Sequence, residues 1–570
     1  VAAICVIYSV ANIVLFGLFG GFVTYPLLAL VGNVRMLGSS VKAHLTAPLV
    51  LGLLVVPVSY VSLVEASARL VPGWAQGSRH RRLVVMSTAL LWVALGQYAF
   101  TTEWATRQDR KVSANPQWVL ASSWWQAVSG GLVVRMTDQF APGDLDDFEP
   151  IGSRPPTAAA VLQRIKPKAG RRTTPARPPN VILLVLESVA ARWTSLYGGP
   201  YPSTPVLQAE LAHAMRFDRV YAHIGRSSNS LLAILLSLYP KLDFRDVTDQ
   251  YPRIDGTSVA SVFHDRGYRT AFVTSSDISW ASWNRFLPGR GFDDIKDRRA
   301  LDWCKEEISS WGVEDRCMVD AMVGALDTER GKPFFLMGWT TQTHHPYEPT
   351  PGVPLIDMEH EPVPDQYNLG RYLNVLHETD RHIGRLFAAL RERHLESDTI
   401  VVITGDHGQA FGYPHDDYVQ GRSVYEEDVH VPFVVWSPKR YPKPVSSVTV
   451  GSHVDVAPTI AELAGLPAAP DWQGRSLFDQ NRSGRAYFYV AEDSFTLGVR
   501  EGRWKYIYDL RQGTEALYDL DGDPNEQANV APGHRDLCTR LRQRLAAWTE
   551  ANRRQYGRVT PTGTPGTSHD

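Results

Sequence analysis

The sequence lacks any marked excess of charge: 58 basic residues stand against 60 acidic ones, a formal net charge of -2 over 570 residues. Without a basic surplus the chain has no general attraction to a polyanion, so nucleic-acid binding is not the expected function. Cysteine is also scarce, with four residues and no Cys-x-x-Cys pair. This excludes a small disulfide-stapled protein and gives no sign of a thiolate metal site.

Charge is missing altogether from the first 33 residues, and two further uncharged stretches follow. A bilayer-spanning helix needs roughly 20 consecutive apolar residues. We therefore predict an all-α transmembrane region over residues 1–102, with three helices at about 4–31, 44–64 and 83–102. The alternative, three buried core helices of a soluble domain, is weaker because three long uncharged stretches come in succession.

The basic residues between these stretches set the predicted orientation. The loop between the second and third helices holds Arg69, Arg79, Arg81 and Arg82, against Arg35 and Lys42 in the preceding loop. The positive-inside rule then places the second loop in the cytoplasm, which predicts a multi-pass protein of the cytoplasmic membrane with everything after Thr102 outside. In that oxidising compartment Cys304 and Cys317 form either a disulfide or two separate buried thiols.

Residues 103–178 are expected to form a juxtamembrane segment and linker. The first part contains Trp104, Trp118, Trp124 and Trp125 among polar residues, which suits either a helix at the membrane interface or an ordinary packing face. The second part is rich in proline and arginine and is typical of an extended linker. At the other end of the chain, residues 555–570 are expected to be disordered.

From residue 179 onward, short apolar runs alternate with helical patterns. Five runs are expected to be buried strands: 181–187, 269–276, 333–339, 399–406 and 431–437. The alternation predicts an α/β catalytic domain over 179–466 with a largely parallel sheet flanked by helices. Aromatic alternation after residue 467 predicts a small antiparallel C-terminal subdomain over 467–554, ending in a helix near 535–554.

Two of these runs end in groups that bind metals. Glu187 closes the run that starts at residue 181, and Asp406 with His407 closes the run that starts at residue 399. In an open α/β sheet, functional groups gather at the carboxyl ends of the strands. Carboxylate oxygens with an imidazole suit one divalent metal, and these residue types do not choose among Mn, Zn and Mg. The alternative makes Glu187 a helix-cap neighbour and Asp406 a turn residue.

A serine cluster offers a nucleophile for such a metal. Ser227, Ser228 and Ser230 open an apolar helical stretch. A hydroxyl bound to a cation becomes a competent nucleophile, and a helix N-terminus favours an arriving anion, although serines also cap helices with no catalytic role. Histidines complete the set, because imidazole can ligate metal, bind phosphate or protonate a leaving alcohol. The candidates are His344, His345, His415 and His430.

Together, these segments resemble the sulfatase-like branch of the alkaline phosphatase superfamily over about residues 179–530. The resemblance rests on NVILLVLESVAARWTSLYGG, the serine helix ending in SLYP, HHPY, TGDHGQAFG, YEEDVHVPFVVWSP, HVDVAPTIAELAGLP and LYDLDGDPNEQANV. It implies an alkaline-phosphatase-like fold and a metal-dependent enzyme that acts on sulfate or phosphate esters.

Within that branch the details resemble lipoteichoic acid synthases and phosphoethanolamine transferases. Sulfatases carry Cys- or Ser-x-Pro-x-Arg, the source of formylglycine, and usually paired aspartates after the first strand. This chain instead has Ser227-Ser228-Asn229-Ser230-Leu231 and a lone Glu187. Ser227 with Ser230 matches the spacing of the transferase nucleophile and its following serine. Trp283-Asn284-Arg285 resembles a segment that contacts phosphoglycerol in lipoteichoic acid synthases.

The resemblance implies a membrane-anchored phosphotransferase that moves a phospholipid head group, phosphoglycerol or phosphoethanolamine, to an envelope glycan or lipid. Ser227 would be the nucleophile, and His345 or His344 would be the acid. The metal ligands would be Glu187, Ser227, Asp406 and His407. Arg226, His415, His430, Trp283 and Arg285 are the expected substrate contacts. A sulfatase-like hydrolase of sulfate or phosphate esters is the first alternative, and a non-catalytic envelope protein with a relic site is the second.

Overall fold

The computed structural model describes residues 2–19, 21–29, 38–70, 115–128, 136–153, 178–304, 307–329, 331–356, 368–415, 420–491 and 495–557, with isolated positions between 83 and 98. The chain divides into two compact units, Val1–Leu132 and Val133–Asp570. Each unit is described by itself. The linker predicted before residue 178 and the tail predicted from residue 555 lie largely outside the described residues.

The described residues of the N-terminal unit are mostly helical. The helices with described bounds are α1 (Ala2–Phe19), α2 (Tyr25–Ala29), α3 (Gly38–His44), α4 (Ala47–Leu70) and α6 (Pro116–Val128). The predicted first span, 4–31, is not one continuous helix, because α1 ends at Phe19 and α2 begins at Tyr25. Pro26 lies in the first turn of α2, where proline is tolerated, whereas in a continuing helix it would remove a backbone hydrogen bond.

One of these helices is long and apolar enough to cross a bilayer. Within α4, the stretch Ala47–Ala66 has a mean hydropathy of 2.2, and no other described helix meets the same test. This stretch coincides with the second predicted span, 44–64. Most of the third predicted span, 83–102, lies outside the part of the chain that the structure describes.

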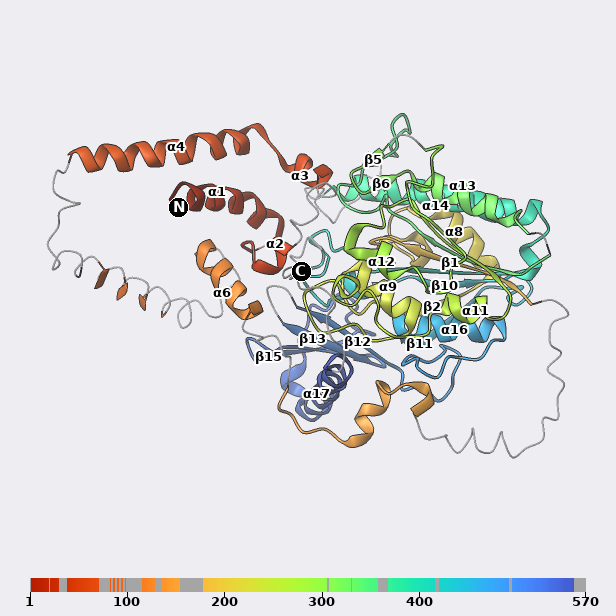
Figure 1. The fold of residues 1–570 in the computed structure, drawn as a ribbon. Helices are drawn as coiled ribbons and strands as arrows, with labels where there is room; N and C mark the ends of the chain where they lie inside the picture. The colour runs from red at the N-terminus through yellow and green to blue at the C-terminus, as the bar shows by residue number, and fades with distance from the viewer. Residues whose placement is uncertain are drawn as a thin grey trace, which may run out of the picture. The chain divides into compact units, whose positions relative to one another are not determined.

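The second unit is built on a nine-stranded mixed sheet (Figure 1). The strand order is β11-β2-β10-β8-β1-β7-β3-β4, with β9 paired to β2. All pairs are parallel except those that β10 makes with β2 and β8, and that β9 makes with β2. The strands are β1 (Asn180–Leu186), β2 (Ala214–Tyr221), β3 (Arg269–Thr274), β4 (Asp294–Lys296), β7 (Phe334–Trp339), β8 (Thr399–Gly405), β9 (His430–Val431), β10 (Phe433–Trp436) and β11 (Val445–Ser452).

Helices cover both faces of this sheet, and the side chains of β1 pack against helices on each face. Every residue of β1 is buried, and alternate side chains enter two separate cores. Val181, Leu183 and Val185 pack toward α9 (Ser227–Leu236), α11 (Val259–His264) and α16 (Val456–Ala464). Ile182, Leu184 and Leu186 pack toward α8 (Pro205–Glu210), α13 (Asp315–Leu326) and α14 (Leu369–Glu392). A strand buried on both faces has no polar alternation, as the sequence predicted.

All five predicted strands are present, as β1, β3, β7, β8 and β10, so the largely parallel α/β sheet is confirmed. Two long strands were not predicted from the sequence. β2 reads AMRFDRVY and β11 reads VSSVTVGS, with half-buried or exposed residues among the buried ones. They lack a continuous apolar run because β11 forms one edge of the sheet, and β2, its neighbour, carries charged side chains between its buried residues.

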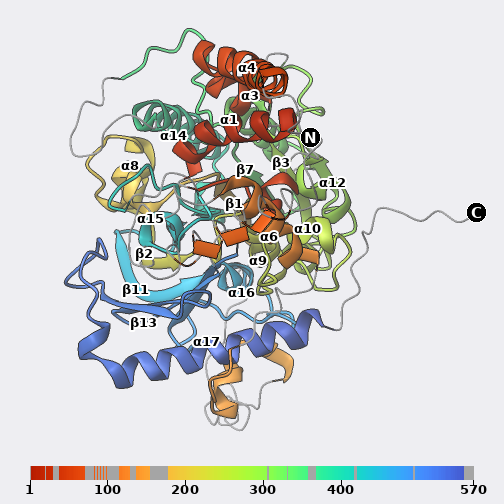
Figure 2. The ribbon, with the colours of Figure 1, turned by 90° about the vertical axis from the view of Figure 1, so that its left-hand side faces the viewer.

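The antiparallel C-terminal sheet is also confirmed. It contains β12 (Arg485–Val490), β13 (Thr496–Glu501), β14 (Trp504–Asp509) and β15 (Thr514–Asp519), and α17 (Arg535–Tyr556) packs on β13 and β14 (Figure 2). Residues 136–153, which we placed in the juxtamembrane segment, belong to this unit instead. Phe148 packs against Tyr239 and Tyr487, and Asp147 pairs with Arg485 at 2.9 Å.

A short hairpin completes the unit beside the sheet. It is formed by β5 (Glu307–Ser309) and β6 (Gly312–Val313). A disulfide joins Cys304 to Cys317 across this hairpin, which resolves the alternative of two buried thiols. Main-chain bonds from Asp277 to Trp311 and from Val313 to Ser275 attach the hairpin next to the carboxyl end of β3.

A buried lysine joins the C-terminal sheet to the catalytic domain and gives a stability prediction. Lys505 is fully buried, and its ammonium lies 3.0 Å from Glu426 and 2.9 Å from Glu526. Lys505→Ala is expected to lower the free energy of unfolding by about 3–5 kcal/mol, because it leaves the buried Glu526 carboxyl without its cation and Glu426 with Arg500 alone, at 3.6 Å. Denaturant unfolding measures this, with the exposed Lys443→Ala as control. A loss below about 1 kcal/mol would show that this ion pair does not hold the two parts together.

Candidate active site

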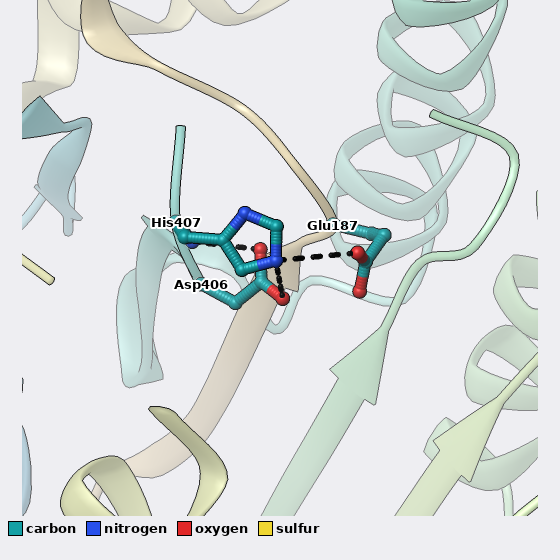
Figure 3. Close-up of side chains that lie close together, drawn as sticks. All are labelled: Glu187, Asp406 and His407. Carbon is teal, nitrogen blue, oxygen red and sulfur yellow. Dashed lines mark hydrogen bonds and ion pairs between the residues drawn. The ribbon is translucent and has the colours of Figure 1, made fainter. Parts of the chain in front are cut away.

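Three of the four predicted metal ligands lie together at the carboxyl edge of the sheet. β1 and β8 are neighbouring parallel strands in which Leu186 pairs with Gly405, so the residues that follow each strand emerge side by side. These residues are Glu187 from one strand and Asp406 with His407 from the other. One ligand atom from each lies within 4.8 Å of the others, and all three side chains are buried (Figure 3).

The hydrogen bonds around this group leave its metal-binding atoms facing one another. The Asp406 Oδ1 oxygen accepts the main-chain N–H groups of Ser188 and His407 at 2.7 and 2.8 Å. The other oxygen, Oδ2, is buried and accepts no hydrogen bond from the described residues. His407 Nδ1 lies 2.9 Å from the carbonyl oxygen of Gly408, so Nδ1 carries the proton. Its Nε2 lone pair then faces Glu187 Oε1 at 3.7 Å and Asp406 Oδ2 at 3.4 Å.

The electrostatic environment of these three side chains favours the binding of a cation. Burial raises the pKa of Asp406 well above its ordinary value, and the neighbouring Glu187 carboxylate adds to the rise. Burial also opposes the ionisation of Glu187, but charge interactions with His407 and His344 lower its pKa on balance. Burial lowers the pKa of His407 from its ordinary value. Two buried carboxyl groups, an unsatisfied oxygen and an imidazole fit one divalent metal ion.

Ser227 reaches this group from the start of α9. Its Oγ lies 3.1 Å from Glu187 Oε2 and 3.3 Å from His407 Nε2. The serine is the first residue of the helix and not its N-cap, and the N-cap residue, Arg226, makes no side-chain capping bond. Simple capping therefore does not explain the hydroxyl at this position. An anion next to Ser227 would also meet the main-chain N–H groups of the first turn of α9.

The residues around Ser227 hold it in place. One turn along the helix, Ser230 donates to the main-chain oxygen of Asp406 at 2.6 Å, which ties α9 to the ligand turn. Ser228 bonds to Asp246, and Arg226 pairs with the same carboxylate at 3.5 Å. Ser228 and Ser230 are buried, whereas Ser227 is half-buried. Of the three hydroxyls, Ser227 is the one open to a substrate.

Of the two adjacent histidines, the structure brings His344 to the site. It lies close enough to Glu187 and His407 to interact electrostatically with both. Its Nδ1 lies 2.8 Å from the carbonyl oxygen of His345, and its ring packs on Trp311 with centroids 4.0 Å apart. The ring of His345 packs edge-on against Tyr347 instead, with centroids 5.4 Å apart. His344 is therefore the better placed of the two predicted acids.

Two further predicted histidines are held away from the ligand group. His415 Nδ1 lies 2.7 Å from Glu427, and its ring stacks on Tyr425 with centroids 3.6 Å apart. His430 stacks on Tyr221 and bonds through Nε2 to the main-chain oxygen of Asp218 at 3.0 Å. Burial lowers the pKa of His415, but its hydrogen bond to Glu427 and the charge of that carboxylate raise the pKa on balance. Burial lowers the pKa of His430.

The predicted Trp283 and Arg285 contacts also lie apart from the metal ligands. Trp283 is 5% exposed and packs edge-on against Trp339, with centroids 4.9 Å apart, so it supports that ring from behind. Arg285 is exposed and lines a separate cavity of about 570 Å³ together with Asn284 and Arg253.

The structure adds residues that sequence reasoning missed. Trp339, the last residue of β7, donates its indole N–H to Glu187 Oε2 at 3.2 Å. The hydroxyl of Thr340 accepts the main-chain N–H of Glu187 at 2.9 Å. His453 Nε2 donates to the main-chain oxygen of Gly405 at 2.9 Å, just before Asp406. The signal available for Trp339 was its place at the carboxyl end of a predicted strand, whereas the role of His453 depends on contacts that sequence spacing does not show.

The bond from Trp339 gives a prediction about metal affinity. Trp339→Phe keeps the aromatic packing but removes the donor that orients Glu187. Groups that orient a metal ligand typically contribute 10–100-fold to affinity or activity, so we expect a loss of about 10-fold or more in metal affinity by competition with a chelator. Trp436→Phe is the matched control, because it removes a similar indole bond to Glu210, 2.9 Å long and away from this group. Equal affinities in the two variants would contradict the role of Trp339.

The site combines two buried carboxyl groups, an imidazole and a serine at the carboxyl edge of an α/β sheet. This arrangement is typical of metal-dependent hydrolases and transferases that cleave esters. The family model named Sulfatase matches residues 179–466, which is half of the chain, and the protein belongs to this family. A second model, the C-terminal region of N-sulphoglucosamine sulphohydrolase, matches residues 415–551. The chain is thus a sulfatase-like enzyme of the alkaline phosphatase superfamily.

Characterised relatives include both sulfatases and a transferase. The chain is 28% identical to an N-acetylgalactosamine-6-O-sulfatase of Bacteroides thetaiotaomicron over 253 residues, 38% of this chain and 47% of that protein. It is 30% identical to arylsulfatase K of Bos taurus over 30% of this chain and 35% of that protein. It is 33% identical to phosphoglycerol transferase I of Xanthomonas axonopodis pv. citri over 25% of this chain and 20% of that protein. The matches span less than half the length of each relative.

Solved structures agree on the fold. A protein of the alkaline phosphatase superfamily from Vibrio parahaemolyticus aligns with a TM-score of 0.54 and 20% identity, over 74% of this chain and 94% of that one. The lipoteichoic acid synthase LtaP from Listeria monocytogenes aligns with a TM-score of 0.52 and 19% identity, over 68% of this chain and 94% of that one.

Proposed function

We propose that the protein is a membrane-anchored, metal-dependent phosphotransferase. It moves a phospholipid head group, phosphoglycerol or phosphoethanolamine, to an envelope glycan or lipid through a phosphoserine ester at Ser227. The observation that carries this proposal is the Ser227 hydroxyl, half-buried at the start of α9 and 3.1 Å from Glu187. A hydroxyl in this position is a nucleophile for phosphorus and needs no modification of the residue.

Different residues of the chain would serve different steps of such a reaction. A divalent ion held by Glu187, Asp406 and His407 would lower the pKa of the serine hydroxyl and offset the charge of the phosphate. Ser227 Oγ attacks phosphorus, and the Glu187 carboxylate lies within reach of the hydroxyl proton. The bond from phosphorus to the diacylglycerol oxygen breaks, and His344 protonates the departing alcohol. An acceptor alcohol then attacks the phosphoserine ester, takes the head group and restores the serine.

The sequence around the nucleophile separates this proposal from a sulfatase. A sulfatase forms formylglycine within Cys- or Ser-x-Pro-x-Arg, whereas here Asn229 and Leu231 occupy the proline and arginine positions. The phosphoglycerol transferase relative supports transfer to an acceptor. A hydrolase of sulfate or phosphate esters is the second candidate, supported by the sulfatase relatives and by the match of the C-terminal region. A relic site is disfavoured because all four predicted metal ligands, Ser227 among them, converge.

The products formed from vesicles test this function. We expect the full-length protein, supplied with vesicles of phosphatidylglycerol and phosphatidylethanolamine and with Mn²⁺, to release diacylglycerol from one of the two lipids. Phosphatidic acid should not form, because the bond that breaks lies between phosphorus and the diacylglycerol oxygen. Cleavage of an aryl sulfate without diacylglycerol release would favour the sulfatase alternative.

The proposal also includes a membrane anchor. Among the described helices, α4 is the one that would span the membrane. The surface of α4 is apolar, with exposed side chains that include Leu51, Leu54 and Val58. The full chain is expected to stay in the membrane pellet after an alkaline carbonate wash, which releases proteins bound only at the surface. Val56→Arg, at the middle of the span, should reduce the inserted fraction severalfold, since a central arginine costs about 2.5–3.5 kcal/mol, whereas Val56→Leu should not. Release of the unmodified chain by carbonate would contradict the anchor.

A further inference from the structure

Helix α6 carries an exposed aromatic ridge in the N-terminal unit. The helix has 13 residues and no charged side chain. Trp118 and Trp125 are each 64% exposed, and Trp124 is 47% exposed. Trp118, Ala121 and Trp125 follow the i, i+3, i+7 spacing of one helical face, and all three are exposed. Three tryptophans gathered on one side of a short helix form a large apolar surface.

Two polar side chains of α6 attach the helix to its own unit. The Gln117 side-chain amide donates to Ser9 Oγ at 2.7 Å and to the main-chain oxygen of Cys5 at 3.1 Å, both on α1. Ser123 Oγ accepts the main-chain N–H of Tyr25, the first residue of α2, at 2.8 Å. A helix on the surface of a water-soluble protein turns polar side chains outward. The residues of α6 that the structure describes as exposed are Trp118, Ala121, Trp124 and Trp125, and none of them is charged, so the outer face suits a medium less polar than water.

We propose that α6 lies in the plane of a phospholipid bilayer, with its tryptophan ridge in the boundary between head groups and acyl chains. A 13-residue helix is about 20 Å long, too short to span a hydrocarbon core of about 30 Å. Tryptophan is the side chain most suited to this boundary, because its ring is apolar and its N–H can bond to head groups. The inference rests on the proposed membrane anchor but not on the proposed reaction.

Two features favour a lipid surface over a second protein chain. α6 contacts α1, and α1 contacts α4, whose exposed side chains are apolar as well, so the ridge belongs to a unit with a lipid-compatible surface. The sequence just before α6 reads RQDRK at residues 107–111, and such basic residues suit anionic head groups. α6 has no charged residue, whereas the rim of a protein interface usually carries charged groups.

Photocrosslinking of the full-length protein in vesicles tests the placement. p-Benzoylphenylalanine replaces Trp118 or Trp125 one at a time, and the control replaces Trp303, which is 50% exposed in the catalytic unit. In vesicles of phosphatidylethanolamine and phosphatidylglycerol, we expect lipid adducts at positions 118 and 125 at least fivefold above position 303. Gel filtration in detergent checks that each variant is folded.

Each outcome of the crosslinking decides the inference. Lipid adducts at positions 118 and 125 support it even when the protein releases no diacylglycerol, which would count against the reaction alone. Adducts to a second copy of the chain, seen as a doubled mass, would overturn it and make the ridge a dimer contact. Lipid adducts no more frequent than at position 303 would overturn it as well.

Discussion

Ser227→Ala is expected to lower the rate of diacylglycerol release by about 10⁴-fold or more while the protein still binds its metal. The variant removes the one atom that attacks phosphorus, and losing a nucleophile typically removes nearly all catalysis by such a group. Metal content should fall little, because Glu187, Asp406 and His407 remain. The measurements are initial rates on vesicles and elemental analysis of the same purified sample.

The matched control for this variant is Ser446→Ala, which makes the same chemical change at an exposed position on β11. Its rate should equal that of the unmodified protein. Ser227→Thr gives a further contrast, because it retains a hydroxyl and should keep measurable activity. If Ser227→Ala released diacylglycerol within tenfold of the unmodified rate, another group would be the nucleophile and the proposed phosphoserine would be wrong.

Glu187→Gln should abolish both metal binding and activity. The amide has nearly the same shape as the carboxylate, and its oxygen can still accept the indole N–H of Trp339, so the packing around β1 should remain. It lacks the negative charge that offsets a divalent cation beside Asp406 and His407. We expect bound metal to fall from about one ion per chain to less than about a tenth of that, by elemental analysis after dialysis.

The control for the charge change is Glu462→Gln, at an exposed position on α16. It should leave metal content and rate unaltered. Unfolding midpoints of both variants in the absence of metal separate lost binding from lost folding. Metal content in Glu187→Gln equal to that of the unmodified protein would place the metal elsewhere.

The metal group could be predicted from the sequence because it depends on a simple rule. Glu187, Asp406 and His407 end two continuous apolar runs, and runs of that kind form parallel strands whose carboxyl ends lie at one edge. The same reasoning placed Ser227 at a helix start. It could not choose between His344 and His345, because adjacent residues differ only in where their side chains point.

Residues whose role depends on long-range packing could not be predicted. His430 follows the ligand turn in sequence, but the pairing of β9 with β2 places it next to Tyr221 and Asp218. Trp283 resembled a substrate contact, yet it packs behind Trp339. The edge strand β11 and its neighbour β2 were missed because half-buried or exposed polar residues interrupt the apolar pattern. In each case a partner far away in sequence decides the outcome.

The covalent intermediate is the central claim, and the mass of one tryptic peptide tests it most directly. Trypsin should cut after Arg226 and after Lys241, which releases the peptide of residues 227–241. From protein quenched in acid during turnover on vesicles, the account predicts a phosphoglycerol or phosphoethanolamine adduct on Ser227. The adduct should be missing from Ser227→Ala. A formylglycine at position 227 would contradict the account and make the protein a sulfatase.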